Sequence, residues 1–447
     1  MHTMHRKFLA AALLCQLPAL AQPPSPALIA KAKAIHSRVL KLDTHDDIDV
    51  ANFTPDCNYT QRLATQVNLP KMADGDMNVA FFIVYVGQGL PNAEAYAAAY
   101  QQAIEKFDAI HRFTSKIAPD LIGLALTPDD VRRLHRQGKR VAVIGVENAY
   151  PIGTDISRVK EFYTRGGRYM SLAHNGNSQL ADSNTGEASG YLHNNGLSPL
   201  GREVIAEMNR LGMMVDLSHP SKGANLEAIR LSKAPVIASH SSVRALADHS
   251  RNMDDAQLLA LKKNGGVIQI VGFASYLKVD SKERAAALAA LRTDFGFGAG
   301  PRTGAPVFRR PSRVCILDEP AKSVLPPAPR RSAFLNMLPA DRRAEYEKRL
   351  ADIDARFPPA PRANVKDMVD HIDYAVNLIG IDHVGISSDF DGGGGIDGWD
   401  SAADAFNVTL ELVRRGYSEP QIAKLWGGNL LRVWASVEKV AKQLQKH

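Results

Sequence analysis

Cysteine is scarce in this chain of 447 residues, which contains only 3. Cys15 lies near the N-terminus, and Cys57 and Cys315 stand alone, so no cluster has the spacing of a thiolate metal site. Cys57 and Cys315 could pair in an oxidising compartment. Their separation in the sequence says nothing about their distance in space, so the sequence leaves this pairing open.

Long apolar runs are absent beyond the N-terminus, so we expect no transmembrane segment after residue 21. The first 21 residues combine a basic start, an apolar run over residues 8–17 and the small-residue motif Ala19-Leu20-Ala21. This pattern predicts a secretory signal peptide cleaved after Ala21, and therefore an exported, periplasmic or secreted protein. The run is too short for a membrane anchor. A lipoprotein anchored at Cys15 is the other alternative, although Leu14 is large for the position before a lipidated cysteine.

A nucleic-acid-binding motif is also absent, despite a net charge of +7. Much of the basic excess lies in residues 302–362, where arginine and proline are dense and aromatic residues are not interleaved with them. This distribution favours a solvated basic surface, so we expect no nucleic-acid partner.

Apolar runs alternate with helix-like segments along most of the chain, which is typical of repeated βα units. The predicted strands cover residues 39–43, 79–86, 140–146, 168–173, 213–217, 235–239, 266–271 and 383–387. Helices are expected between them, for example over residues 93–114, 127–137, 198–211, 223–231 and 254–263. Eight strands with intervening helices predict a (β/α)8 TIM-like barrel of the α/β class.

We expect residues 22–447 to form a single barrel domain. An Arg/Pro-rich insertion, residues 276–362, interrupts the pattern before the last strand. Its composition suits an elaborated loop better than a second core. A peripheral insertion is favoured over a substrate lid. Residues 435–447 are predicted to form a charged C-terminal tail.

Five predicted strands end with a side chain that can bind a metal ion or transfer a proton. These side chains lie in the segments 42–47, 143–147, 215–219, 236–240 and 386–389. Parallel barrel strands all open onto one face, so we expect these side chains to meet there. The arrangement indicates a metal-dependent hydrolase.

His45 and Asp47 are two residues apart, so their side chains leave a strand on the same face. A charged group inside a barrel is costly unless it is paired or binds a metal ion. Glu147 is either a surface residue or a carboxylate that bridges two cations with its two oxygens. His219 and His240 follow consecutive predicted strands, which favours an ion such as Zn²⁺.

The residue patterns leave three roles open. Asp389 and Asp391 could both be ligands, or one could transfer protons while the other stabilises a turn. His174 ends the fourth predicted strand, where it could stabilise an oxyanion or be a hydrogen-bonded barrel residue. Arg251 could bind a substrate carboxylate or lie on the surface.

The motifs as a group resemble the renal dipeptidase, or membrane dipeptidase, family within the amidohydrolase superfamily. The matching segments are residues 43–47, 66–71, 145–147, 172–177, 181–183, 216–219, 235–252, 383–392 and 427–433. They follow the family order across nearly the whole predicted barrel. The sequence departs from the common pattern at Asp46, Asn148 and Leu180, which puts the shape of the pocket in doubt but removes no ligand.

The resemblance implies two Zn²⁺ ions per chain. One would be held by His45, Asp47 and Glu147, and the other by Glu147, His219 and His240. The resemblance also implies Asp389 as the catalytic acid and base, with His174 and Arg251 contacting the substrate and His174 stabilising the oxyanion.

The resulting expectation is hydrolysis of dipeptides by a metal-activated bridging hydroxide, with tolerance of a C-terminal D-residue. The alternatives are an amidohydrolase that acts on an ester, lactone, phosphotriester or β-lactam, and a non-catalytic metal or peptide binder. A small dipeptide is the expected partner. A homodimer is a candidate assembly that the sequence does not decide.

Overall fold

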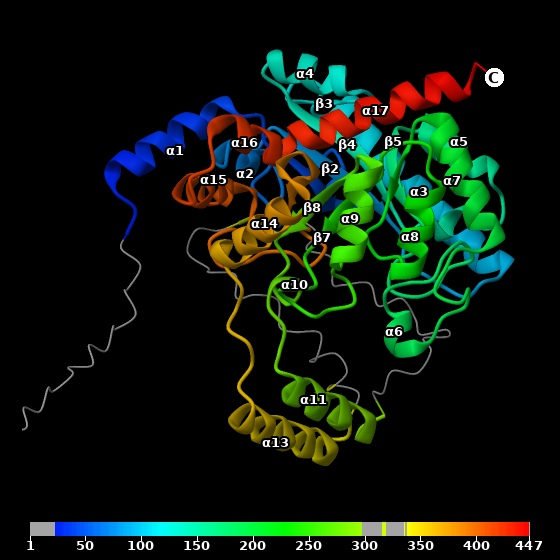
Figure 1. Ribbon diagram of the computed structural model, residues 1–447, viewed down its shortest axis with the longest axis vertical. Helices are drawn as coiled ribbons and strands as arrows, with labels where there is room; N and C mark the ends of the chain where they lie inside the picture. Colours follow the sequence, from blue (N-terminus) through cyan, green and yellow to red (C-terminus); the bar gives the residue numbers. More distant parts are fainter. Residues whose placement is uncertain (1–22, 297–314, 319–334, 336–337, 447) are drawn as a thin grey trace, which may run out of the picture.

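Parallel strands form the centre of the protein in a computed structural model, which describes residues 23–296, 315–318, 335 and 338–446 (Figure 1). The predicted signal peptide, residues 1–21, and part of the insertion lie outside the described residues. Within the described residues, no helix combines the length and apolar character that crossing a bilayer requires.

Eight strands surround the barrel axis in the order β1, β2, β4, β5, β6, β7, β8 and β9. All neighbouring pairs are parallel, and a bridge between Asp46 and Phe390 joins β1 to the residues after β9. The strands are β1 (Leu42–Asp47), β2 (Val79–Tyr85), β4 (Arg140–Glu147), β5 (Gly167–Ser171), β6 (Met214–Asp216), β7 (Ile237–Ser241), β8 (Val267–Val271) and β9 (Val384–Ser387). The predicted (β/α)8 TIM-like barrel is confirmed. A short strand that the sequence did not suggest, β3 (Ile122–Leu124), pairs with the first residues of β4, Arg140 to Ala142.

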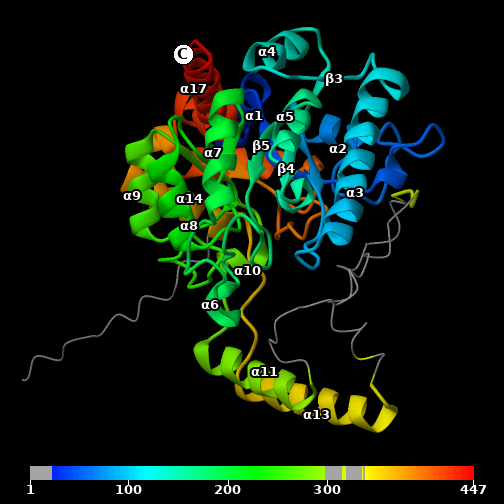
Figure 2. The same cartoon turned by 90° about the vertical axis from the view of Figure 1, so that its right-hand side faces the viewer.

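Helices cover the outside of the barrel (Figures 1 and 2). They are α1 (Pro26–Arg38), α2 (Leu69–Asp74), α3 (Ala93–Arg112), α4 (Pro128–Arg136), α5 (Ser157–Thr164), α6 (Gly186–Ser189), α7 (Pro199–Leu211), α8 (Lys222–Leu231), α9 (Asp255–Asn264), α10 (Ala274–Leu277), α14 (Val365–Ile379), α15 (Ala405–Arg414), α16 (Glu419–Ala423) and α17 (Asn429–Leu444). In both views α4 and α17 lie at one end of the barrel, and α6 and α10 lie at the other.

Alternating side chains of β2 build two layers of core. Phe81 and Ile83 point into the barrel, while Phe82 and Val84 pack against the surrounding helices. This period of two is the ordinary consequence of strand geometry. Trp434 of α17 closes the barrel interior at the end where α4 and α17 lie, and its ring centroid is 6.3 Å from that of Phe81.

The tail predicted for residues 435–447 is instead a continuation of α17, which runs to Leu444. Val433, Val437 and Ala441 recur at helical spacing and are buried. This apolar stripe packs the helix against the barrel, so its charged residues occupy only the solvent-facing side.

The insertion lies between β8 and β9, where the sequence predicts it. Its helices α11 (Lys282–Asp294) and α13 (Ala340–Arg356) lie side by side beyond the barrel end that carries α6 and α10 (Figure 2). Leu291, Phe295 and Tyr346 form a small separate core between them.

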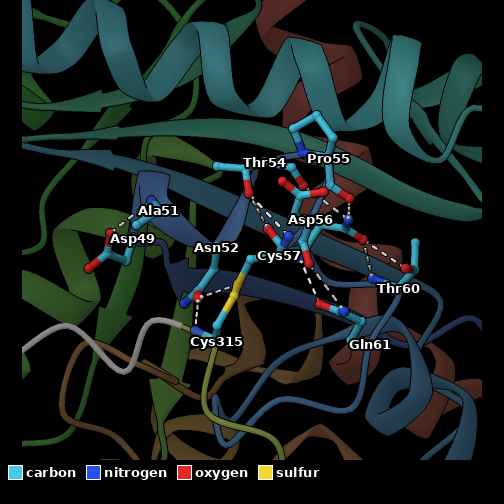
Figure 3. Close-up of a disulfide and its surroundings, with 11 residues drawn as sticks. Asp49, Ala51, Asn52, Thr54, Pro55, Asp56, Cys57, Thr60, Gln61 and Cys315 are labelled. Atoms are coloured by element: carbon cyan, nitrogen blue, oxygen red, sulfur yellow. Dashed lines mark hydrogen bonds between the residues drawn. A yellow bond between two sulfur atoms is a disulfide. The ribbon is translucent and has the colours of Figure 1, made fainter.

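A disulfide joins the insertion to the loop after β1, because Cys315 is paired with Cys57 (Figure 3). The neighbouring backbone adds hydrogen bonds from Ala64 N to Ile316 O at 2.7 Å and from Asp318 N to Arg62 O at 2.9 Å. The cysteine pairing that the sequence leaves open is therefore present, and it anchors residues 315–318 to the loop that follows β1.

His371 of α14 should make the stability of the fold depend on pH. Val243 N donates to its Nδ1 at 3.1 Å, and its Nε2 lies 3.1 Å from Leu277 O. Burial lowers the pKa of His371 from 6.5 to about 4. The unfolded chain therefore binds the proton more readily than the folded protein. The contribution of the neutral His371 to the free energy of unfolding is complete above about pH 6.5, and it is lost as the pH falls toward about 4. The loss is at most about 3 kcal/mol.

The measurement compares the melting temperatures of the wild type and a His371→Asn variant at pH 7 and pH 5. Asn does not titrate, so the wild-type advantage should shrink at pH 5. A difference that stays constant between the two pH values would contradict the expectation.

Candidate metal centre

The strand-end side chains meet inside the barrel because of strand phase. On β4, Val141 and Val143 face the interior, and Glu147 has the same phase. On β1, the pairing register shifts between Asp43 and Asp46, which changes the alternation and turns His45 into the interior.

Two other residues reach the centre through unusual backbone conformations. His219 has φ of 84° and Asp389 has φ of 58°, both in the left-handed region that side chains larger than glycine rarely adopt. Such conformations persist when surrounding contacts enforce them, and they are frequent at functional sites. Both residues lie in the loops just after strand ends, His219 after β6 and Asp389 after β9.

Glu147 is the centre of the cluster, and its two oxygens face different partners. Oε1 lies 2.8 Å from His219 Nε2 and 3.2 Å from His240 Nε2. Oε2 lies 3.6 Å from His45 Nε2, which in turn lies 3.6 Å from Asp47 Oδ2. The carboxylate therefore stands between a His45–Asp47 side and a His219–His240 side.

The other ring nitrogens of these histidines fix their tautomers. Asn175 Oδ1 lies 3.2 Å from His219 Nδ1 and can only accept, so Nδ1 is the donor. Tyr169 donates its hydroxyl hydrogen to Thr44 O, so its oxygen accepts from His45 Nδ1 at 2.9 Å. Both rings consequently turn Nε2 toward Glu147, and in the neutral form of each ring this nitrogen carries the lone pair.

The tautomer of His240 is also fixed by a hydrogen bond at Nδ1, through Ser239 and Asp216. Ser239 donates its hydroxyl to Asp216 Oδ2 at 2.6 Å, so Ser239 Oγ accepts from His240 Nδ1 at 2.8 Å. Partners of this kind orient metal-binding histidines and raise their basicity.

The centre therefore brings hydrogen-bond acceptors together without enough donors. His219 Nε2 and His240 Nε2 lie 3.1 Å apart, and the buried His45 Nε2 has no hydrogen-bond partner among the residues that the structure describes. Two lone pairs at this distance repel each other unless a cation lies between them. Three overlapping groups could hold a metal ion: His45 with His240 and Asp389, Glu147 with His174 and His219, and His45 with Asp47 and Glu147.

The protonation equilibria agree with cation binding. Burial lowers the pKa values of His219 and His240 well below their usual range, which keeps both rings neutral. Burial opposes the charged forms of Glu147 and His45, but nearby opposite charges prevail: the pKa of Glu147 lies well below its usual range, and that of His45 well above. Neutral imidazole and ionised carboxylate are the ligand forms that metal ions bind, so His219, His240 and Glu147 already have these forms, whereas His45 must release its proton when a cation binds.

The two carboxylates that spacing could not distinguish have different surroundings. Asp391 accepts hydrogen bonds from the backbone of Gln66 at 3.0 Å and of Val67 at 3.3 Å, so it fixes the loop after β1. Asp389 Oδ1 instead lies 3.9 Å from His45 Nε2. Burial, with the charges of Asp47 and Glu147, raises the pKa of Asp389 well above its usual range.

Two glycines allow this close packing. A Cβ at Gly392 would lie 2.1 Å from Asp389 Oδ1 and 2.3 Å from Asp47 Oδ2, which it would displace. At Gly145 it would lie 2.3 Å from Cζ of the Tyr169 ring. The glycine two residues before Glu147 therefore makes room for the tyrosine that orients His45.

His174 and Arg251 lie around the same centre. His174 Nε2 is 3.7 Å from Glu147 Oε1. Arg251 is buried, with 3% of its surface exposed, and donates to Ser241 Oγ and His240 O, each at 2.9 Å. Because Arg251 is buried, the interpretation of it as a surface residue is wrong, and within the described part of the chain its Nε has no hydrogen-bond partner.

A parallel α/β barrel with buried histidines and carboxylates at its strand ends defines the class of metal-dependent hydrolases. The model of the membrane dipeptidase family, peptidase family M19, matches residues 29–447. The chain belongs to this family, and the predicted resemblance is confirmed. The family supports metal-dependent hydrolysis of dipeptides.

Individual relatives agree with this assignment. Dipeptidase tcpJ of Claviceps purpurea is 30% identical over 387 residues, which cover 86% of this chain and 72% of that protein. The uncharacterized dipeptidase C965.12 of Schizosaccharomyces pombe is 28% identical over 415 residues, covering 91% of this chain and 80% of that protein.

Solved structures share the fold. The probable dipeptidase PvdM from Pseudomonas aeruginosa has a TM-score of 0.74 at 34% identity, covering 93% of this chain and 99% of that chain. A metallopeptidase from Rhodobacter sphaeroides, liganded with a phosphinate mimic of the dipeptide L-Ala-D-Ala, has a TM-score of 0.63 at 20% identity and covers 89% and 99%.

Tyr169 is a site residue that sequence reasoning missed, because a tyrosine inside a strand looks like ordinary core. A Tyr169→Phe variant loses the acceptor for His45 Nδ1 and should bind metal about 10-fold to 100-fold more weakly. Competition with a chelator of known affinity measures this loss.

Tyr59→Phe is the matched control for this experiment. The Tyr59 hydroxyl is also buried, but no described residue forms a hydrogen bond with it. Metal affinity should therefore stay at the wild-type value in Tyr59→Phe. Equal affinities in the wild type and Tyr169→Phe would contradict the role of Tyr169.

Proposed function

We propose that the protein is a binuclear zinc dipeptidase. One Zn²⁺ is held by His45, Asp47 and Glu147, and the second by Glu147, His219 and His240. The observation that carries the proposal is the position of Glu147, whose two carboxylate oxygens face separate histidine sets. A carboxylate placed in this way can bridge two cations.

The donor atoms suit zinc. Imidazole nitrogens and carboxylate oxygens, with no thiolate among them, are the donors of many catalytic zinc sites. When bound, the ions would lower the pKa of a water molecule and polarise the scissile carbonyl. This is the chemistry that the predicted bridging-hydroxide mechanism requires.

Three residues around the ions carry out proton transfer, oxyanion stabilisation and substrate binding. Asp389 takes a proton from the attacking water and returns it to the leaving amine. His174, on the opposite side of Glu147 from His45, stabilises the oxyanion. Arg251 holds the terminal carboxylate of the substrate, which limits hydrolysis to short peptides.

Two further features belong to this proposal. We infer that a C-terminal D-residue is accepted, since one structural neighbour binds a mimic of L-Ala-D-Ala. We also propose that residues 1–21 direct export, so that the enzyme acts in the periplasm or outside the cell.

Replacement of Glu147 by Gln should reduce the metal content at both sites, because the same carboxylate serves both ions. Elemental analysis of protein prepared with excess Zn²⁺ should fall from two ions per chain in the wild type to one or fewer. Glu94→Gln, an exposed change on α3, is the control and should retain both ions. Two ions in Glu147→Gln would contradict the bridging role.

Replacement of Asp389 by Asn should preserve the metal content but lower kcat by about 10²-fold to 10⁴-fold. The assay uses zinc-loaded protein and dipeptides with an L- or D-residue at the C-terminus. Full turnover by Asp389→Asn would contradict the assignment.

The same assay separates the alternative functions when an ester, a lactone, a phosphotriester and a β-lactam are added to the substrate panel. Preferential turnover of dipeptides is the expected result. Preferential turnover of another class would replace the proposal, and binding without turnover would favour a peptide-binding protein.

A further inference from the structure

Lys106 of α3 lies beside the candidate metal centre, although no motif in the sequence points to it. Its Nζ is 5.7 Å from the centroid of the Tyr85 ring. Tyr85 ends β2, where it pairs with Glu147 of β4. The Tyr85 ring also lies 4.6 Å from the His174 ring, so only one aromatic ring separates Lys106 from His174.

The positive charge of Lys106 is not matched by an ion pair. Among the residues that the structure describes, no carboxylate lies within 4.0 Å of its Nζ. Other lysines in buried surroundings do have such partners: Lys41 contacts Asp76 at 2.8 Å, and Lys71 contacts Asp318 at 3.1 Å. An ammonium group partly removed from water without a carboxylate is available to bind an anionic ligand.

Two of the three acidic residues that influence Lys106, Asp47 and Glu147, belong to the metal centre. Burial lowers the pKa of Lys106, and the carboxylates of Asp47, Glu147 and Asp49 oppose this effect. Under the proposed function, Asp47 and Glu147 bind cations, which neutralise their charge. The attraction between these carboxylates and Lys106 is then weakened, and a carboxylate from the substrate can take their place.

Lys106 and Arg251 lie on opposite sides of the barrel axis. The strand order places β2 second and β7 sixth among the eight barrel strands, so three strands lie between them in either direction. Lys106 contacts the end of β2, and Arg251 binds the end of β7. The metal centre lies between these two cationic groups.

We propose that Lys106 binds an acidic side chain on the N-terminal residue of the substrate, so that the enzyme prefers dipeptides that begin with Glu or Asp. The inference rests on the proposed function, in which Arg251 holds the C-terminal carboxylate and the scissile bond lies at the metal centre. The N-terminal residue must then extend from the metal centre away from Arg251, toward Tyr85 and Lys106.

The test uses zinc-loaded enzyme and two dipeptides of nearly equal shape, Glu-Ala and Gln-Ala. The wild type should show a kcat/KM for Glu-Ala about 10-fold or more above that for Gln-Ala, since a hydrogen bond to a charged group contributes about 1.5–3 kcal/mol. In Lys106→Met this ratio should fall to about one. Lys106→Arg should restore part of the preference because it keeps the charge.

Lys160→Met is the matched control, since it removes the charge of an exposed lysine on α5 and should keep the wild-type ratio. Metal content and melting temperature, measured for each variant, identify any that misfold. If Lys106→Met fails to fold, Lys106→Gln replaces it.

Three outcomes would overturn the inference. A wild-type ratio near one, with both dipeptides cleaved, refutes the role of Lys106 and leaves the proposed function intact. An equal loss for both dipeptides in Lys106→Met assigns the lysine to the support of Tyr85 instead. Absence of turnover for every dipeptide refutes the proposed function itself, and the inference with it.

Discussion

The repulsion between acceptor atoms around Glu147 is the constraint on which the site depends. The carboxylate is buried with three imidazole rings whose Nε2 atoms point toward it, at distances from 2.8 to 3.6 Å. Each Nδ1 has an oxygen partner, so each ring in its neutral form presents a lone pair, not a hydrogen, from Nε2 to the carboxylate. Burying such groups is unfavourable unless a cation compensates them, and the rest of the barrel holds them in place.

Much of this arrangement follows from strand phase and could be read from the sequence. His45, Asp47, Glu147, His219 and His240 all stand at the ends of apolar runs, and parallel strands bring such ends together. The fold was predictable for the same reason, because eight apolar runs alternate with helical segments. The extension of α17 was missed because its charged residues are frequent, although its apolar stripe was present.

Other features depend on contacts between distant parts of the chain, which spacing does not encode. Asp389 and Asp391 differ only because the backbone of Gln66 binds Asp391. Tyr169 reaches His45 because Gly145, on the neighbouring strand, leaves room for its ring. Cys57 and Cys315 are 258 residues apart in sequence, and Lys106 is on an outer helix, so neither the disulfide nor the lysine had a local signal.

The charge distribution across the barrel end explains why a small anionic substrate suits this site. The ion-free centre is rich in carboxylates, and Arg251 and Lys106 flank it on opposite sides. Cations at the centre would neutralise those carboxylates, because the ligand oxygens face inward. The two flanking cationic groups would then dominate the field felt by an approaching molecule, since the opposite charges of the carboxylates would no longer offset them. The same ions that activate water would in this way also turn the site from one that repels carboxylates into one that attracts them.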